Sequence, residues 1–390
     1  MYDFNKQIDR SKTNAEKYTL REKLFGTNDV IPMWVADMDI ATPQFIIDDI
    51  SNRLSHHILG YEEFPSKAKE VQRNWIEKHH NYKIDIEDII FSNSVVTSIN
   101  LAIQAYTKEN DEVVVQPPVY FPFFSSIKNN NRKILRNPLK KDKDGDYTFD
   151  IDDLISKITP KTKLLLLCSP HNPVGRVWKK EELEKLAEVC IKHDIKVFAD
   201  EIHCDLVYDK FKHIPFASLS KEVEDITITA YGVGKTFNLA SIATSTVVIS
   251  NKTMKEKFKK VHEAVHIGEG NAIGHIAFTS AYEKGAEFRY ELLKHLESNI
   301  KLLETTLAPF KHLVNFKRPQ GTYLAWLDCH GMELNDKKLR EFFVKEVKLG
   351  LSSGSAFGKE GSRHMRLNFA VPRAMMEDAC ENINKALCKF

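Results

Sequence analysis

Three polar side chains of this sequence each follow an apolar run and could act together on one ligand. Asn172 lies between two prolines, Asp200 ends the run 197–199, and Lys235 follows the run 226–230. The intervals of 28 and 35 residues between them suit successive strand–helix–strand units, which need about 30 residues each. Because parallel strands end at one edge of a sheet, the three side chains can converge on a planar cofactor. A Schiff-base lysine and an acid beside a pyridinium nitrogen are the requirements of pyridoxal phosphate (PLP).

Each of these three side chains also has a simpler structural interpretation. Lys235 could be a surface lysine, Asp200 a helix N-cap and Asn172 part of a proline-flanked turn. The sequence around Lys235 favours the chemical role. Gly232 and Gly234 permit close approach of a ligand, and the apolar neighbours would desolvate the amine and lower its pKa.

Further residues could complete a cofactor site. Tyr120, in an aromatic cluster, could stack on a pyridine ring or pack in the core. The segment 94–98 follows a strand and opens a helical pattern, so its N–H groups could hold a phosphate. Arg366 lies in an apolar strand, where it could bind a substrate carboxylate or pair with an internal acid. His203, His213 and His266 have no metal-ligand spacing, so no metal site is expected.

The elements that must position these residues alternate between short β-rich runs and helical patterns. Several runs are continuously apolar, as in strands covered on both faces, and 180–194 predicts an amphipathic helix. The alternation predicts an α/β fold with a mostly parallel sheet flanked by helices. The strands are expected at 88–92, 112–116, 163–168, 195–199, 226–230 and 245–249.

From about residue 285 the pattern changes to long helices around short strands, which predicts a smaller α+β domain. Its helices are expected at 290–307 and 335–347, and its strands at 321–327 and 365–369. The predicted division is an N-terminal segment (1–45) that packs with the small domain, a large cofactor-binding domain (46–284) and a small C-terminal domain (285–390).

The length, composition and net charge of the chain are those of an ordinary globular enzyme. The 390 residues carry a net charge of only +2, which argues against nucleic-acid and membrane partners. No run approaches the roughly 18 apolar residues of a membrane span. The six cysteines form no C-x-x-C pair and the N-terminus has no signal-peptide pattern, so we expect a reduced, cytoplasmic protein.

Taken together, these residues resemble the fold-type I PLP enzymes of the aminotransferase class I/II superfamily, across nearly the whole chain. The closer resemblance is to the MalY/PatB group of cystathionine (cysteine-S-conjugate) β-lyases. The strings that carry it are IPMWVADMD (31–39), GY (60–61), SPHNPVG (169–175), DEIHCDL (200–206), KTFNLA (235–240), GTYLAW (321–326) and RLNFA (366–370).

The resemblance implies a role for each matching residue. Lys235 would form the Schiff base with PLP and move the substrate Cα proton, and Asp200 would hold the pyridinium proton. The other implied contacts are Asn172 and His203 near the ring hydroxyl, Tyr120 on the ring face, Val95, Val96 and Gly232 at the phosphate, Arg366 and Ala36 at the substrate, and Tyr61 reaching the partner's site in a homodimer.

The sequence departs from the family at three positions. The family usually has serines at the positions of Gly232 and Gly234, and at least one of them contacts the phosphate. Ala243 stands where a larger polar residue is common. We therefore expect weaker cofactor retention, unless Thr229 or Thr244 compensates; the missing side chains could also widen the site.

The activity that the resemblance implies is a PLP-dependent C–S β-lyase. It would cleave L-cystathionine or S-substituted L-cysteines to a thiol, pyruvate and ammonia. The alternative is an aminotransferase with the same residues, because the two reactions diverge only after the Cα proton is removed. A regulator that binds a transcription factor, and an inactive protein with this fold, are the remaining alternatives.

Overall fold

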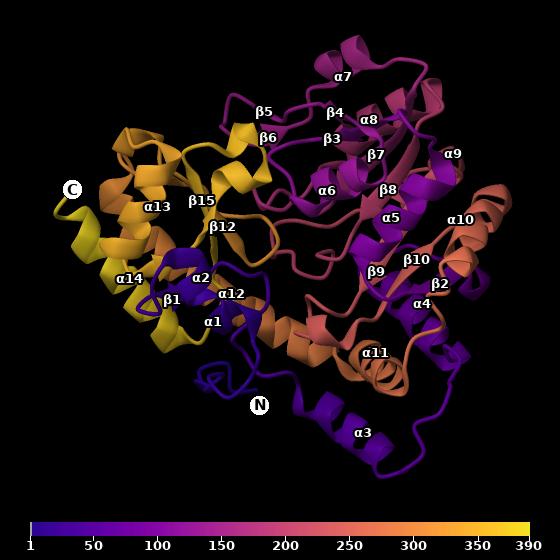
Figure 1. Ribbon diagram of the computed structural model, residues 1–390, viewed down its shortest axis with the longest axis horizontal. Helices are drawn as coiled ribbons and strands as arrows, with labels where there is room; N and C mark the ends of the chain where they lie inside the picture. Colours follow the sequence, from indigo (N-terminus) through magenta and orange to yellow (C-terminus); the bar gives the residue numbers. More distant parts are fainter. Residues whose placement is uncertain (1) are drawn as a thin grey trace.

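A seven-stranded sheet organises the middle of the chain (Figure 1). The computed structural model describes residues 2–390. The strand order is β2-β10-β9-β8-β7-β3-β4, and all neighbours pair in parallel except β10, which is antiparallel to β2 and β9. The strands are β2 Ile89–Ser92, β3 Glu112–Val115, β4 Lys133–Arg136, β7 Thr162–Cys168, β8 Lys196–Asp200, β9 Thr227–Gly232 and β10 Ser245–Val248. The predicted α/β class is confirmed.

The central strands are covered on both faces, which explains their continuous apolar sequences. Along β7, Leu164 and Leu166 join one hydrophobic cluster, whereas Leu165 and Leu167 join another. Such alternation is the period of a strand whose two faces are both buried. The six predicted strands of this sheet are confirmed, with ends that differ by one or two residues.

Helices cover the large sheet and continue into the second part of the chain (Figure 1). The amphipathic helix predicted at 180–194 is α8, and its buried side chains belong to the cluster that contains Leu165. The helices are α1 Glu16–Thr19, α2 Arg21–Phe25, α3 Gln44–Leu54, α4 Ser66–His80, α5 Val95–Tyr106, α6 Pro122–Asn129, α7 Ile151–Lys157, α8 Lys180–Lys192, α9 Lys221–Glu224, α10 Lys252–Ala264, α11 Ala272–Lys284, α12 Ala286–Leu307, α13 Asp336–Lys345 and α14 Arg373–Leu387. Among residues 2–390, none of these helices is long and apolar enough to cross a membrane.

A second, antiparallel sheet lies beside α12 and α14 (Figure 1). The predicted strand at 321–327 begins later than expected, because Gly321 forms an isolated bridge with Val207 and Thr322 has a φ of 67°. The strands of this sheet, in spatial order, are β11 Asn315–Phe316, β12 Leu324–Asp328, β15 His364–Asn368 and β14 Ser352–Ser353; a separate hairpin joins β5 Lys140–Lys141 and β6 Tyr147–Thr148.

The N-terminal segment is bound to the C-terminal part of the chain. Strand β1 (Ile31–Pro32) pairs in parallel with β13 (Leu349–Gly350). The Asn368 Nδ2 atom donates to the carbonyls of Val35 and Asp37, both at 2.6 Å. On this basis we propose the division into 1–45, 46–284 and 285–390, whose boundaries stay a prediction.

Candidate active site

A cavity of about 530 Å³ opens where several strands of the large sheet end. Its walls come from the N-terminal segment, the large sheet and the smaller sheet. The predicted site residues that line it are Ala36, Val95, Val96, Tyr120, Asn172, Asp200, His203, Lys235 and Arg366. Two predicted residues do not line it: Gly232 is buried at the end of β9, and Tyr61 is fully exposed.

Lys235 lies inside the cavity, so the interpretation as a surface lysine is wrong. It follows the buried strand β9, and its Nζ atom donates to the carbonyl oxygen of Ala36 at 2.7 Å. Burial, together with the guanidinium of Arg366, lowers the pKa of Lys235 to about 8. The amine is therefore unprotonated far more often near neutral pH than that of an ordinary lysine, and the unprotonated amine is the form that attacks a carbonyl carbon.

Asp200 ends β8 and is only 4% exposed. Its Oδ1 accepts a hydrogen bond from the Ile202 N–H at 3.2 Å, but 201–205 forms turns rather than a helix, so the N-cap interpretation is wrong. Burial raises the pKa of Asp200 to about 6. Within residues 2–390 no cationic side chain lies in ion-pair range of this carboxylate. A buried carboxylate of this kind fits a ligand that brings its own positive charge.

Arg366 is buried beside Asn172 and has no acidic partner in the described part of the chain. Its Nη1 donates to Asn172 Oδ1 at 3.0 Å, and its Nη2 donates to the carbonyl of Trp34 at 2.7 Å. Its Nε has no partner among residues 2–390, and burial lowers the pKa of Arg366 to about 10. The alternative of an internal ion pair is therefore wrong, and the guanidinium is suited to an external carboxylate.

His203 and Tyr120 complete the polar wall near Asp200. His203 is 3% exposed, and burial beside Lys235 and Arg366 lowers its pKa well below the ordinary range, so the ring is neutral. Its Nδ1 has no hydrogen-bond partner within the described residues, as expected for a side chain that awaits a ligand. Tyr120 both lines the cavity and packs on the core, with its ring 6.1 Å from that of Phe123.

The start of α5 forms another wall of the cavity. The helix begins at Val95, and Ser94 caps it by accepting a hydrogen bond from the Thr97 N–H at 3.1 Å. Val95 and Val96 lie in the first turn, where backbone N–H groups have no partner within the helix. Such a helix start binds phosphate. With the amine, the unpaired carboxylate and this helix start around one cavity, the residues present fit PLP.

Several residues that line the cavity are not predicted from the sequence. Phe25 and Arg340 lie more than 300 residues apart in sequence, yet the Arg340 guanidinium is 5.7 Å from the Phe25 ring centroid. The pairing of β1 with β13 brings their segments together, and no local pattern signals it. The unpredicted lining residues include Glu16, Leu24, Phe25, Trp34, Phe121, Arg340, Leu351, Ser352 and Phe357.

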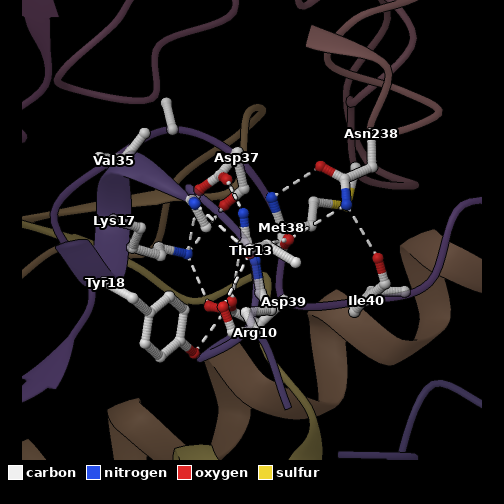
Figure 2. Close-up of polar contacts among 12 residues, drawn as sticks. Arg10, Thr13, Lys17, Tyr18, Val35, Asp37, Met38, Asp39, Ile40 and Asn238 are labelled. Atoms are coloured by element: carbon white, nitrogen blue, oxygen red, sulfur yellow. Dashed lines mark hydrogen bonds and ion pairs between the residues drawn. The ribbon is translucent and has the colours of Figure 1, made fainter. Parts of the chain in front are cut away.

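A buried ionic network holds the segment that carries Ala36 (Figure 2). Lys17 is completely buried, and its Nζ lies 3.3 Å from Asp37 Oδ1 and 2.7 Å from Asp39 Oδ2. Arg10 pairs with the same two carboxylates at 2.8 Å each. Buried charges are tolerated only when they are paired in this way, so the two acids fix the course of the backbone beside Ala36.

The same segment is tied to the loop that carries Lys235 (Figure 2). Asn238 Oδ1 accepts from the Met38 N–H at 3.0 Å, and its Nδ2 donates to the carbonyls of Met38 and Ile40 at 3.1 and 2.8 Å. The Ala36 carbonyl that binds the Lys235 amine is therefore held in place from both sides of the contact.

The two glycines before Lys235 differ in what a side chain would meet. A Cβ at Gly234, which lines the cavity, would lie 3.5 Å from Ala240 Cα, an ordinary van der Waals distance. A Cβ at Gly232 would lie 3.3 Å from Ser245 Cβ, which is tighter. Thr244 also lines the cavity, and its hydroxyl donates to the Ile242 carbonyl oxygen at 3.3 Å. Its compensation for the missing serines stays a prediction.

We expect Gly234→Ser to slow PLP dissociation by about tenfold, the effect of one added hydrogen bond to a charged group. Gly232→Ser is expected to act less, because Ser245 must first move. The measurement is cofactor loss during dialysis, followed by absorbance. Gly234→Ala is the matched control, and equal loss from Gly234→Ser and Gly234→Ala would contradict a role for the hydroxyl.

Comparisons with known proteins agree with this geometry. The Aminotransferase class I and II family matches residues 37–383. The chain is 39% identical over 386 residues to cystathionine beta-lyase PatB of Bacillus subtilis (strain 168), which covers 99% of this chain and 100% of the relative. Cystalysin from Treponema denticola, solved with PLP, has a TM-score of 0.96 and 31% identity, and covers 100% and 99% of the two chains. The PLP-bound C-S lyase from Staphylococcus hominis has a TM-score of 0.90 and 32% identity with the same coverage. The chain belongs to the aminotransferase class I and II family, as its sequence motifs predict.

Proposed function

We propose that this chain is a PLP-dependent C–S β-lyase that acts on L-cystathionine or S-substituted L-cysteines. The observation that carries the proposal is one cavity lined by the Lys235 amine, the Asp200 carboxylate and the Arg366 guanidinium. The similarity to a cystathionine beta-lyase and to a C-S lyase over nearly the whole chain supports this reaction within the family.

The chain's own residues would hold the cofactor at defined atoms. Lys235 Nζ would bind its aldehyde carbon, Asp200 would pair with its ring nitrogen, and the N–H groups of Val95 and Val96 would bind its phosphate. Asn172 and His203 would lie at the ring hydroxyl. When bound, PLP supplies an electron-accepting ring conjugated to the substrate Cα.

The remaining steps belong to the protein. Arg366 would orient the substrate by its carboxylate, with the guanidinium fixed by Asn172 and the Trp34 carbonyl. Lys235, with a pKa of about 8, is matched to removing the Cα proton near neutral pH. Loss of that proton allows the Cβ–S bond to break, and addition of water yields thiol, pyruvate and ammonium in equal amounts.

An aminotransferase would use the same binding residues, so the test must separate the two outcomes. The holoenzyme is incubated with L-cystathionine or S-benzyl-L-cysteine without any keto acid, and thiol and pyruvate are measured. We expect both products in equal amounts over many turnovers. Conversion that stops after one equivalent per site, and resumes only when a keto acid is added, would establish the aminotransferase instead.

We further propose that the protein forms a homodimer in which Tyr61 enters the partner's site. We also propose that the protein is cytoplasmic. Tyr61 is fully exposed, and the neighbouring Ile58 and Leu59 are 70% and 60% exposed, which is unusual for apolar side chains in one loop. The six cysteines are all unpaired thiols, which suits a reducing compartment. A sedimentation mass of one chain would refute the dimer.

A further inference from the structure

Three side chains that the proposed reaction does not use meet at one end of the smaller sheet. Asp328 ends β12, and the β12–β15 register places it opposite His364. His330 begins the short 3₁₀ turn that follows β12. One carboxylate oxygen and one ring nitrogen from each histidine all lie within 4.8 Å of one another. These are the ligand types of a transition-metal site.

One ring nitrogen of His364, Nε2, is available to bind a metal ion. The side chain is buried, with 4% exposure. Its Nδ1 lies 2.9 Å from the Ser362 carbonyl oxygen; since a carbonyl can only accept, Nδ1 is the donor. The other nitrogen, Nε2, has no hydrogen-bond partner among residues 2–390. A ring nitrogen that donates to a backbone carbonyl while its partner nitrogen stays free is the arrangement found in metal-binding histidines.

The free Nε2 lies 3.7 Å from Asp328 Oδ2. Both atoms are acceptors and the gap is too wide for a direct hydrogen bond, so the two atoms do not bind each other directly. A zinc ion placed about 2.0–2.2 Å from each atom, the usual coordination distance, would span this gap.

The surroundings hold the three ligands in place. The indole of Trp326 stacks on the His364 ring, with centroids 4.9 Å apart and an interplanar angle of 14°. His330 Nδ1 lies 2.6 Å from Asp328 Oδ1, and the Arg363 guanidinium donates to the His330 carbonyl at 2.6 Å. Both rings are thus oriented by their neighbours, but the contact between His330 Nδ1 and Asp328 Oδ1 is a hydrogen bond that must open before both atoms could bind one metal ion.

In this structure the Asp328 carboxylate forms an ion pair with Lys141. Lys141 Nζ lies 3.0 Å from Asp328 Oδ2, and its side chain is 45% exposed. Asp328, His364 and Lys141, but not His330, line a second cavity of about 310 Å³. A cation that binds here must therefore displace the Lys141 ammonium, which can move into solvent.

We propose that Asp328, His330 and His364 bind one divalent transition-metal ion of the Zn²⁺ class, with water completing the coordination. The site is separate from the catalytic cavity. It does not depend on the proposed reaction, since none of its ligands lines that cavity.

The test uses the holoenzyme with Cys388→Ser, because Cys388 is exposed while the other five cysteines are buried. Zn²⁺ is titrated against a chromophoric chelator, and Co²⁺ is added separately to record its visible absorption bands. We expect one equivalent of Zn²⁺, and at least about tenfold weaker binding in Asp328→Asn and His330→Asn. Both variants are preferred to a change at the buried His364, which could impair folding.

Lys141→Ala gives the sharper result, because it is expected to tighten Zn²⁺ binding by removing the competing ammonium. A merely structural cluster would not produce this gain. His193→Asn, a histidine outside the cluster, is the matched control and should bind like the parent. The proposal is overturned if the parent binds no stoichiometric Zn²⁺, if His330→Asn binds like the control, or if Lys141→Ala weakens binding.

Discussion

Replacing Lys235 by alanine is expected to lower thiol release from S-benzyl-L-cysteine by about 10³-fold or more, the usual effect of losing a general acid–base group. The amine lies in the cavity, held by the Ala36 carbonyl at 2.7 Å. His203 also lines the cavity, but burial holds its pKa well below the ordinary range, so it is too weak a base to take over. The measurement is steady-state thiol and pyruvate production.

The matched control for this change is Lys259→Ala, which removes an exposed lysine from α10. It should retain the parent rate. Thermal unfolding of both variants shows that the loss of rate is not a loss of fold. Activity of Lys235→Ala within tenfold of the parent would rule out the lysine as the group that moves the Cα proton.

The second large effect is expected from Asp200→Asn. This change should lower the activity of the holoenzyme but raise the stability of the apoprotein. In the holoenzyme the amide cannot act as the anionic partner of a protonated ring nitrogen, so we expect kcat to fall by about 10²-fold or more. In the apoprotein the same change should stabilise the fold, since it removes a buried charge that has no ion-pair partner among residues 2–390, and desolvation outweighs the attraction of Lys235.

The pH dependence of this stabilisation follows from the pKa of Asp200. Burial raises the pKa of Asp200 from 3.8 to about 6 in the folded chain, so the native state holds the proton that the unfolded chain releases. The native stability of the parent is therefore lost progressively from about pH 4 to about pH 6 and stays lower above that range. At pH 8 the apo Asp200→Asn variant should unfold with a free energy higher by up to about 3 kcal/mol.

The measurement is urea unfolding of the apoproteins at pH 4 and pH 8. The gain of Asp200→Asn should be present at pH 8 and nearly absent at pH 4. Asp209→Asn, which changes an exposed acid, is the control and should show no such dependence. A gain of the same size at both pH values would mean that the carboxylate charge is not its cause.

The large sheet was predictable because its central strands are buried on both faces. In a chain of this composition, a continuous apolar run such as 163–168 is best explained as a strand that is buried on both faces. Strand β4 escaped prediction for the opposite reason: Lys133 and Arg136 bound it, and it lies at the sheet edge, where one side meets solvent. Its sequence therefore carries only a weak strand signal.

The candidate site divides in the same way. Asn172, Asp200 and Lys235 were predictable because each closely follows a strand of one sheet, so local pattern and sheet topology together bring them to one edge. Phe25 and Arg340 were not, because their approach depends on pairing between the two ends of the chain. The role that we propose for Tyr61 depends on a second chain, about which a single sequence carries no geometric information.

The burial of Lys17 is another feature that the sequence does not predict. A lysine in a polar N-terminal stretch is ordinarily exposed, yet this one is completely buried between Asp37 and Asp39. Only the fold shows that two acids, 20 and 22 residues further along the chain, neutralise it. Its burial is also what keeps the backbone beside Ala36 fixed.

The ties between the two ends of the chain set an order of events during protein synthesis. The Lys235 amine binds Ala36, 199 residues earlier, and Arg366 binds the carbonyl of Trp34, 332 residues earlier. A nascent chain that has emerged only as far as α11 already contains Lys235, Asp200 and the start of α5. It lacks Arg366, and it lacks Asn368, which holds the carbonyls of Val35 and Asp37. A chain that ends there therefore contains residues that we propose to contact the cofactor but lacks the arginine that we propose to bind the substrate carboxylate, so we expect it to be inactive.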